Sequence, residues 1–169
     1  MRTTAALDDG QLLNRRAGWI TASVIGLMAL ALRLVGLGFP RSIMFDETYY
    51  VKDALTLDTY GYSTKWYPDD EDHPNANFNQ GDFHEMSDEP AYVVHGELGK
   101  WFIAIGMRAF GADNPFGWRF TAAIAGVICV ILVGRIAMQL FRSAGLATLA
   151  AGLLAIVCLG IALCRFALL

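Results

Sequence analysis

Apolar residues gather in three long runs of the 169-residue chain, and one long polar stretch separates the first run from the other two. The runs cover residues 17–39, 116–140 and 144–164. Each run is long enough for a helix that crosses a bilayer, which takes about 20 residues. The pattern therefore predicts an all-α integral membrane protein with three transmembrane helices, preceded by a tail over residues 1–16.

Basic residues at the ends of the runs predict the orientation, because lysine and arginine in short flanks stay in the cytoplasm. Arg15 and Arg16 precede the first run, and Arg135 and Arg142 flank the turn between the second and third. Two crossings separate these groups, so both fall on one side. We expect a multi-pass protein of the cell (plasma) membrane with a cytoplasmic N-terminus and an extracytoplasmic loop over residues 40–115. The first run is too long for the core of a signal peptide and no small-residue cleavage site follows it, which favours an uncleaved anchor.

The loop contains two segments with helical periodicity, near residues 47–59 and near residues 97–110. Asp46 stands where it would cap the first helix. The second helix is predicted to lie in the membrane interface, with an apolar face made of Leu98, Trp101, Phe102, Ile105 and Ala109.

Residues 67–90 lie between these two helices and are rich in Asp, Asn, Gly and Pro. This composition predicts an irregular surface loop. Loops as long as residues 40–115 are commonly functional, so the loop is where we look for chemistry.

Charge and cysteine placement narrow the function. The formal net charge is −3, and thirteen of the sixteen acidic residues lie between Asp46 and Glu97. A nucleic-acid partner is excluded because it needs a clustered basic surface. Cys129, Cys158 and Cys164 all lie in apolar runs, so no disulfide framework is predicted.

Asp46 and Glu47 stand just beyond the first apolar run, where the chain leaves the membrane. A carboxylate there can accept a proton from a hydroxyl group while a lipid-borne sugar approaches from the bilayer. Adjacent helical residues point about 100° apart, which disfavours the facing carboxylates of a glycoside hydrolase. We expect one acid to act as a base and its neighbour to orient the substrate. The alternative is that Asp46 only caps the helix and Glu47 only complements its dipole.

A lipid phosphate that leaves during sugar transfer needs cations nearby. Candidates are Arg119 and Arg165 at the extracytoplasmic ends of the second and third runs, and Lys100 at the start of the second loop helix. Arg33 lies inside the first run. A charge inside a membrane span is costly and is usually paired or functional, although Arg33 can also extend toward the headgroups. The alternative for each of these cations is an interfacial anchor.

Three histidines, His73, His84 and His95, share the loop with many carboxylates. Their spacing matches no tight zinc motif, and the acidic run at residues 69–72 lacks the calcium-loop pattern. We therefore expect a solvated loop and no cofactor. A divalent metal remains the alternative.

Four segments in order resemble the polyprenyl-phosphate-mannose:protein O-mannosyltransferase family, in particular its actinobacterial branch. They are "MFDETYYVKDA", "VVHGELGKWFIAIGMRAFG", "NPFGWRFTAAIAGV" and "CRFALL". The resemblance implies a membrane glycosyltransferase of the GT-C fold, in which two juxtamembrane helices of the first loop frame the active site. It implies a polyprenyl monophosphate mannose donor, Ser/Thr hydroxyls of secreted proteins as acceptors, association with membrane lipid and the translocon, and inversion at the anomeric carbon.

Carried over to this chain, the resemblance makes Asp46 the base and Glu47 a substrate-positioning acid. It makes Arg119 and Arg165 cationic groups of the site, and it places His95 on the loop histidine of the family. Two departures stand out: Gly96 and Glu97 replace the Pro-Pro that usually follows this histidine, and such enzymes have about eleven spans. We therefore expect the chain to be the N-terminal part of such an enzyme, inactive alone. The alternatives are a non-catalytic membrane module that binds a partner or a lipid-linked sugar, and a GT-C transferase of another sugar, such as arabinose or aminoarabinose.

Overall fold

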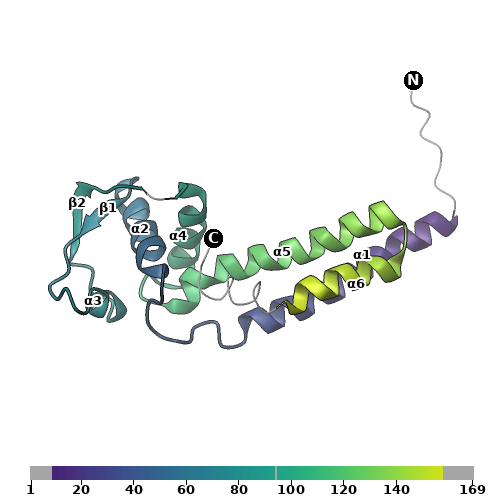
Figure 1. The fold of residues 1–169 in the computed structure, drawn as a ribbon, viewed down its shortest axis with the longest axis horizontal. Helices are drawn as coiled ribbons and strands as arrows, with labels where there is room; N and C mark the ends of the chain where they lie inside the picture. The colour runs from purple at the N-terminus through teal and green to yellow at the C-terminus, as the bar shows by residue number, and fades with distance from the viewer. Residues whose placement is uncertain (1–8, 94, 158–169) are drawn as a thin grey trace, which may run out of the picture.

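The computed structural model describes residues 9–93 and 95–157 (Figure 1). In chain order the elements are α1 (Asp9–Leu34), α2 (Glu47–Tyr60), β1 (Thr64–Trp66), α3 (Ala76–Asn79), β2 (Met86–Pro90), α4 (Glu97–Phe110), α5 (Pro115–Phe141) and α6 (Ala144–Ile156). The helices predicted in the loop correspond to α2 and α4. Figure 1 shows an elongated molecule with α1, α5 and α6 forming a bundle at one end and the remaining elements packed at the other.

Two helices of the bundle are long and apolar enough to cross a membrane, judged by length and composition. They are residues 16–34 of α1 and the whole of α5. The described part of the third predicted span is the shorter helix α6, and residues 158–164 of that span lie outside the described residues. Three crossings therefore stay a prediction.

The bundle packs through small residues. Ala29, Val130 and Ala151 are buried where α1, α5 and α6 meet. A Cβ placed on Gly134 of α5 would lie 3.1 Å from the Cβ of Ala151 of α6, so the two helices are already in close approach. Such small-residue interfaces are typical of helices that associate within lipid.

The first helix ends earlier than the apolar run predicts. It stops at Leu34, because Gly36 adopts a φ of +69°, which glycine adopts at little steric cost. The α5 helix begins where the sequence favours it: Pro115 occupies its first turn, and the Asn114 side chain accepts a hydrogen bond from the amide of Phe116.

The loop contains strands, which corrects the all-α prediction. Strands β1 and β2 pair antiparallel, with Thr64 opposite Pro90 and Trp66 opposite Met86. Together with the short helix α3 they give residues 64–90 a defined structure instead of the irregular loop expected. A second core fixes this region onto α5, made of the buried residues Ile43, Val51, Ala54, Phe78, Ile103, Ala104, Met107 and Trp118.

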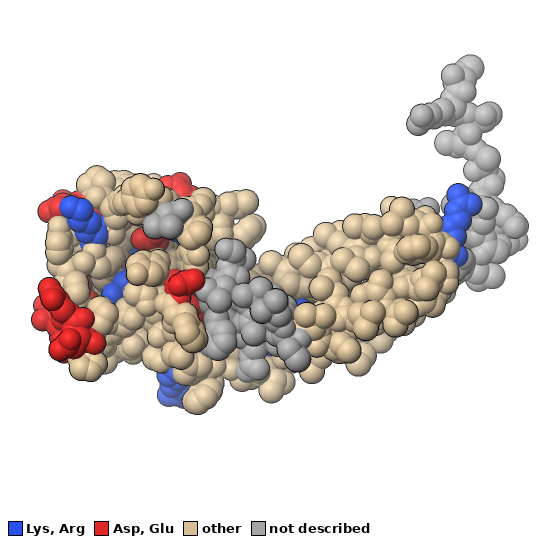
Figure 2. Space-filling model, viewed as in Figure 1, with Lys and Arg blue, Asp and Glu red and all other residues tan. Residues whose placement is uncertain are grey.

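The α4 helix buries one face against the rest of the molecule and exposes several large apolar side chains on the other. Ile103, Ala104 and Met107 are buried against the rest of the molecule. The face predicted to lie in the membrane interface is the exposed one, with Leu98 72% and Ile105 53% exposed. Acidic side chains gather over the opposite end of the molecule from α1's start, and the visible side of the bundle is nearly free of charge (Figure 2).

Candidate active site

Asp46 lies at the start of α2, immediately after the turn that follows α1. Its carboxylate is exposed and makes no capping hydrogen bond, which corrects the prediction that this side chain caps the helix. Glu47 reaches back to the turn before α2, where its Oε2 accepts a hydrogen bond from the amide of Met44 at 3.0 Å. The Asp46 side chain is thus left available for chemistry.

Glu47 and Arg119 form a buried ion pair between α2 and α5. Arg119 donates from Nε to Oε1 and from Nη2 to Oε2 of Glu47, each at 2.7 Å, and both side chains are 0% exposed. The same guanidinium donates to the carbonyl oxygens of Leu37, Pro40 and Ser42 at 2.9–3.2 Å. It thereby ties the turn that carries Asp46 to the start of α5.

This burial changes the roles expected of the pair. A side chain with no exposed surface cannot touch a substrate in this conformation, and the charge of Arg119 is already matched by a carboxylate in the bidentate geometry that arginine favours. In this structure Glu47 and Arg119 hold the turn after α1 against the start of α5. The prediction that they contact the sugar or its phosphate has no support in the geometry.

Lys100 is also committed to a partner. Its Nζ lies 2.6 Å from Oδ2 of Asp53, with the two side chains 3% and 18% exposed. A second ion pair between the same helices joins Arg108 to Asp58. These two ion pairs hold α4 along α2. In this conformation the Lys100 ammonium is therefore paired with Asp53.

A cavity of about 460 Å³ opens beside α2 and brings together residues far apart in sequence. Tyr50, Trp66 and Tyr67 line it, together with Thr48, Tyr49, Lys52, Asp53, Thr64, Lys65, Pro68, Pro74, Ala91, Tyr92, His95 and Lys100. Cavities of this size with aromatic walls and a few polar groups are typical ligand sites.

Tyr50 connects the cavity to Asp46. Burial, and secondly the charge of Asp46, raise the pKa of the Tyr50 phenol, so the carboxylate lies within electrostatic reach of a cavity wall. The rings of Tyr50 and the exposed His95 have centroids 5.4 Å apart. The structure thus brings Asp46, Tyr50 and His95 to one side of α2, and only the first and last of these were singled out from the sequence.

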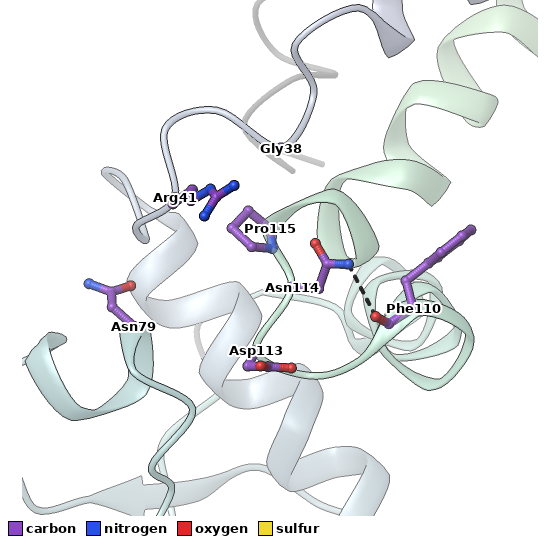
Figure 3. Close-up of a pocket in the computed structure, with 7 residues that line it drawn as sticks. All are labelled: Gly38, Arg41, Asn79, Phe110, Asp113, Asn114 and Pro115. Carbon is purple, nitrogen blue, oxygen red and sulfur yellow. Dashed lines mark hydrogen bonds between the residues drawn. The ribbon is translucent and has the colours of Figure 1, made fainter.

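A second cavity, of about 540 Å³, lies where the turn after α1 meets the start of α5 (Figure 3). Arg41, Asn79 and Asp113 line it, with Gly38, Phe110, Asn114 and Pro115. Asn114 donates to the carbonyl oxygen of Phe110 at 3.1 Å in its wall. Asp46 lines neither cavity, but its charge acts on Tyr50, which lines the first one.

Arg33 and Arg165 complete the predicted cations. Arg33 does not extend to the surface: it is 2% exposed, and its Nη1 donates long hydrogen bonds to the carbonyl oxygens of Ala29 and Ala155 at 3.3 and 3.5 Å. Arg165 lies outside the described residues. Among the described residues, the group able to hold a metal is Asp69, His84 and Glu85, none of which lines the cavity beside Tyr50.

The cavity residues were missed for a physical reason. Trp66 is the last residue of β1 and Tyr67 follows it, and a three-residue strand carries no periodic signal. Tyr50 does carry a signal in the sequence: it stands four residues after Asp46, and residues at that spacing share one face of a helix.

The fold and the site together define a mostly helical membrane protein. At the start of a loop helix it carries an exposed acid, Asp46, near a cavity with aromatic walls. Comparisons with known proteins give the family. Residues 94–168 match the family model of dolichyl-phosphate-mannose-protein mannosyltransferases. The chain is 36% identical over 136 residues to the polyprenol-phosphate-mannose--protein mannosyltransferases of Mycobacterium tuberculosis and Mycolicibacterium smegmatis.

The chain is therefore a relative of the protein mannosyltransferases, and the resemblance predicted from its motifs is confirmed. The matched region covers 78% of this chain and 22% of each of these relatives, so the chain spans about a fifth of their length. No solved structure matches the chain significantly.

Proposed function

We propose that the chain contributes the catalytic base of a protein O-mannosyltransferase. The donor would be mannose on a polyprenyl monophosphate, and the acceptor a Ser or Thr hydroxyl of a secreted protein. The observation that carries the proposal is the state of Asp46: it is exposed, free of any capping bond, and electrostatically coupled to a wall of the aromatic cavity. The names of the mycobacterial relatives support the donor and the reaction class.

In the proposed reaction the Asp46 carboxylate accepts the proton of the acceptor hydroxyl while the oxygen of that hydroxyl attacks the anomeric carbon of mannose. The new carbon–oxygen bond forms as the bond to the lipid phosphate breaks, and the phosphate leaves with the electron pair. One displacement from the face opposite the phosphate inverts the anomeric centre. Tyr50 and His95 would form the acceptor side of the site.

The remaining predicted groups take supporting roles in this proposal. The Glu47–Arg119 pair would hold Asp46 at the end of the first span, and the Lys100–Asp53 pair would hold the cavity wall. Arg165 stays the proposed cation for the leaving phosphate. The loop would face the extracytoplasmic side of the cell membrane, where secreted acceptors emerge from the translocon.

An Asp46→Asn variant tests the proposal. Residues 1–169 replace the matching segment of the Mycolicibacterium smegmatis relative, and transfer of labelled mannose from the lipid donor to an acceptor peptide is measured in membranes. General base catalysis is worth about 10²–10⁴-fold, so transfer should fall by at least about 100-fold. Membrane insertion and thermal stability should not change, because the side chain makes no capping bond.

Asp88→Asn is the matched control, since Asp88 is an exposed acid of β2 outside the cavity. It should transfer mannose at the parent rate. Near-parent transfer by the Asp46→Asn chimera would remove Asp46 from the chemistry. A parent chimera that binds the lipid donor but transfers nothing would favour the non-catalytic module.

A further inference from the structure

The β1–β2 region brings three metal-ligating side chains together from two ends of the loop. Asp69 follows β1, and His84 and Glu85 immediately precede β2. Each offers one ligand atom, and these atoms all lie within 4.8 Å of one another. The sequence hid this group, because the ligands meet through the pairing of the strands and not through a short spacing.

The imidazole of His84 is held by a carboxylate at each ring nitrogen, so a metal would take the place of the proton shared between Nε2 and Asp69. Its Nδ1 lies 2.8 Å from Oδ1 of Asp82, and its Nε2 lies 2.9 Å from Oδ2 of Asp69. A carboxylate on one ring nitrogen fixes the ring and directs the other nitrogen at the metal in many metal sites. In this arrangement Asp82 is the orienting group and Asp69 the neighbouring ligand.

Glu85 is the buried member of the group, and one of its carboxylate oxygens has no hydrogen-bond partner among the described residues. It is only 5% exposed, and its Oε1 accepts hydrogen bonds from the amide of Asp69 at 3.1 Å and from Nδ2 of Asn77 at 2.8 Å. Its buried Oε2 has no hydrogen-bond partner in the described chain. Burial lowers the pKa of Lys52, and the charge of Glu85 acts in the opposite direction. The ammonium of Lys52 donates its hydrogen bond to the carbonyl oxygen of Pro74, at 2.6 Å. A buried carboxylate oxygen without a partner is costly, and a divalent cation would remove that cost.

We propose that Asp69, His84 and Glu85 bind a divalent metal ion of the Zn²⁺ class. One imidazole nitrogen and two carboxylate oxygens are ligands that zinc accepts, with water in the fourth position. Calcium is disfavoured, because it takes six to eight oxygen ligands. The ion would join the segment after β1 to the segment before β2 and so stabilise the connection between the two strands. The site is separate from the proposed mannosyl transfer and does not depend on it.

Zinc binding to the purified 169-residue chain in detergent micelles tests the inference directly. The chain is treated with a chelator and then titrated with Zn²⁺ by calorimetry, with Ca²⁺ titrated in parallel. We expect one zinc per chain and no comparable calcium binding. His84→Ala should weaken zinc binding at least tenfold. Asp82→Asn should weaken it about 10–100-fold while leaving all three ligands in place.

His73→Ala is the matched control. His73 is an exposed histidine of the same loop, and its Nδ1 lies 2.9 Å from Oδ2 of Asp70, but it is outside the group. It should bind zinc as the parent chain does. Absence of stoichiometric zinc, or equal weakening by the His73 and His84 variants, would overturn the proposal. If His84→Ala loses its helical circular dichroism, Asp82→Asn decides: parent-like affinity in that variant would overturn it as well.

Discussion

The Glu47–Arg119 pair makes the strongest stability prediction in the chain. Glu47→Gln changes one atom of the side chain and leaves the Arg119 guanidinium buried without its counter-charge. Both side chains are 0% exposed, so solvent cannot compensate. Removal of one partner of a buried ion pair costs about 3–5 kcal/mol, since the remaining charge stays desolvated. For a chain of this length that loss lowers the melting temperature by roughly 6–20 °C.

Thermal unfolding in detergent micelles, followed by circular dichroism, measures this effect. Glu71→Gln is the control, because Glu71 is exposed in the loop, and its melting temperature should match the parent chain. Combining Glu47→Gln with Arg119→Gln should cost less than the sum of the two single changes by about 1 kcal/mol or more, as coupled residues do. A decrease below about 2 °C for Glu47→Gln alone, well short of the range worked out above, would refute the reasoning.

Two further predictions concern helix packing and the sheet. Gly106→Ala should destabilise the chain by about 1–3 kcal/mol, because the added Cβ would lie 2.1 Å from the carbonyl oxygen of Gly117. Gly152→Ala is the control and should not destabilise the chain, because its Cβ meets nothing within 4 Å. Equal melting temperatures of the two variants would contradict the close approach of α4 and α5. Hydrogen bonding from Lys65 and then Tyr67 lowers the pKa of Glu89 below its usual 4.5, so the ionised form favours the folded sheet and this contribution is lost as the pH falls through the lowered pKa. A carboxyl NMR titration should show a midpoint below 4.5 that rises in Lys65→Met, and a parent midpoint at or above 4.5 would contradict the contact.

The helices were predictable because their signals are local and repeated. The 3.6-residue period over 97–110 predicted both the α4 helix and its apolar face, and the structure exposes that face while burying the opposite side. The strands were not predictable, because β1 has three residues and neither strand alternates clearly between polar and apolar positions. The end of α1 was missed for a related reason: hydropathy continues to residue 39, but one glycine with positive φ ends the helix earlier.

The site was predictable as a list of residue types and not as an arrangement. Asp46, Glu47, Lys100 and Arg119 were all named from the sequence, yet the ion-pair partners of the last three lie 47 to 72 positions away along the chain. Ion pairing over such separations depends on how helices pack, which no local pattern reports. The structure therefore adds the pairing that the sequence does not give: Glu47 lies in a buried ion pair with Arg119, and Lys100 lies in one with Asp53.

The pairing of acids along α2 is the reason for proposing Asp46, and not one of its neighbours, as the base. The segment from residue 46 to residue 60 carries four acids, and three of them have a cation: Glu47 has Arg119, Asp53 has Lys100 and Asp58 has Arg108. Asp46 has no ion pair in the described part of the chain and no capping bond, and it is the exposed member of the four, whereas Glu47 is buried and the other two are half-buried. The ion pairs of the other three acids hold α2 against α4 and α5. These contacts fix the position from which Asp46 would take a proton.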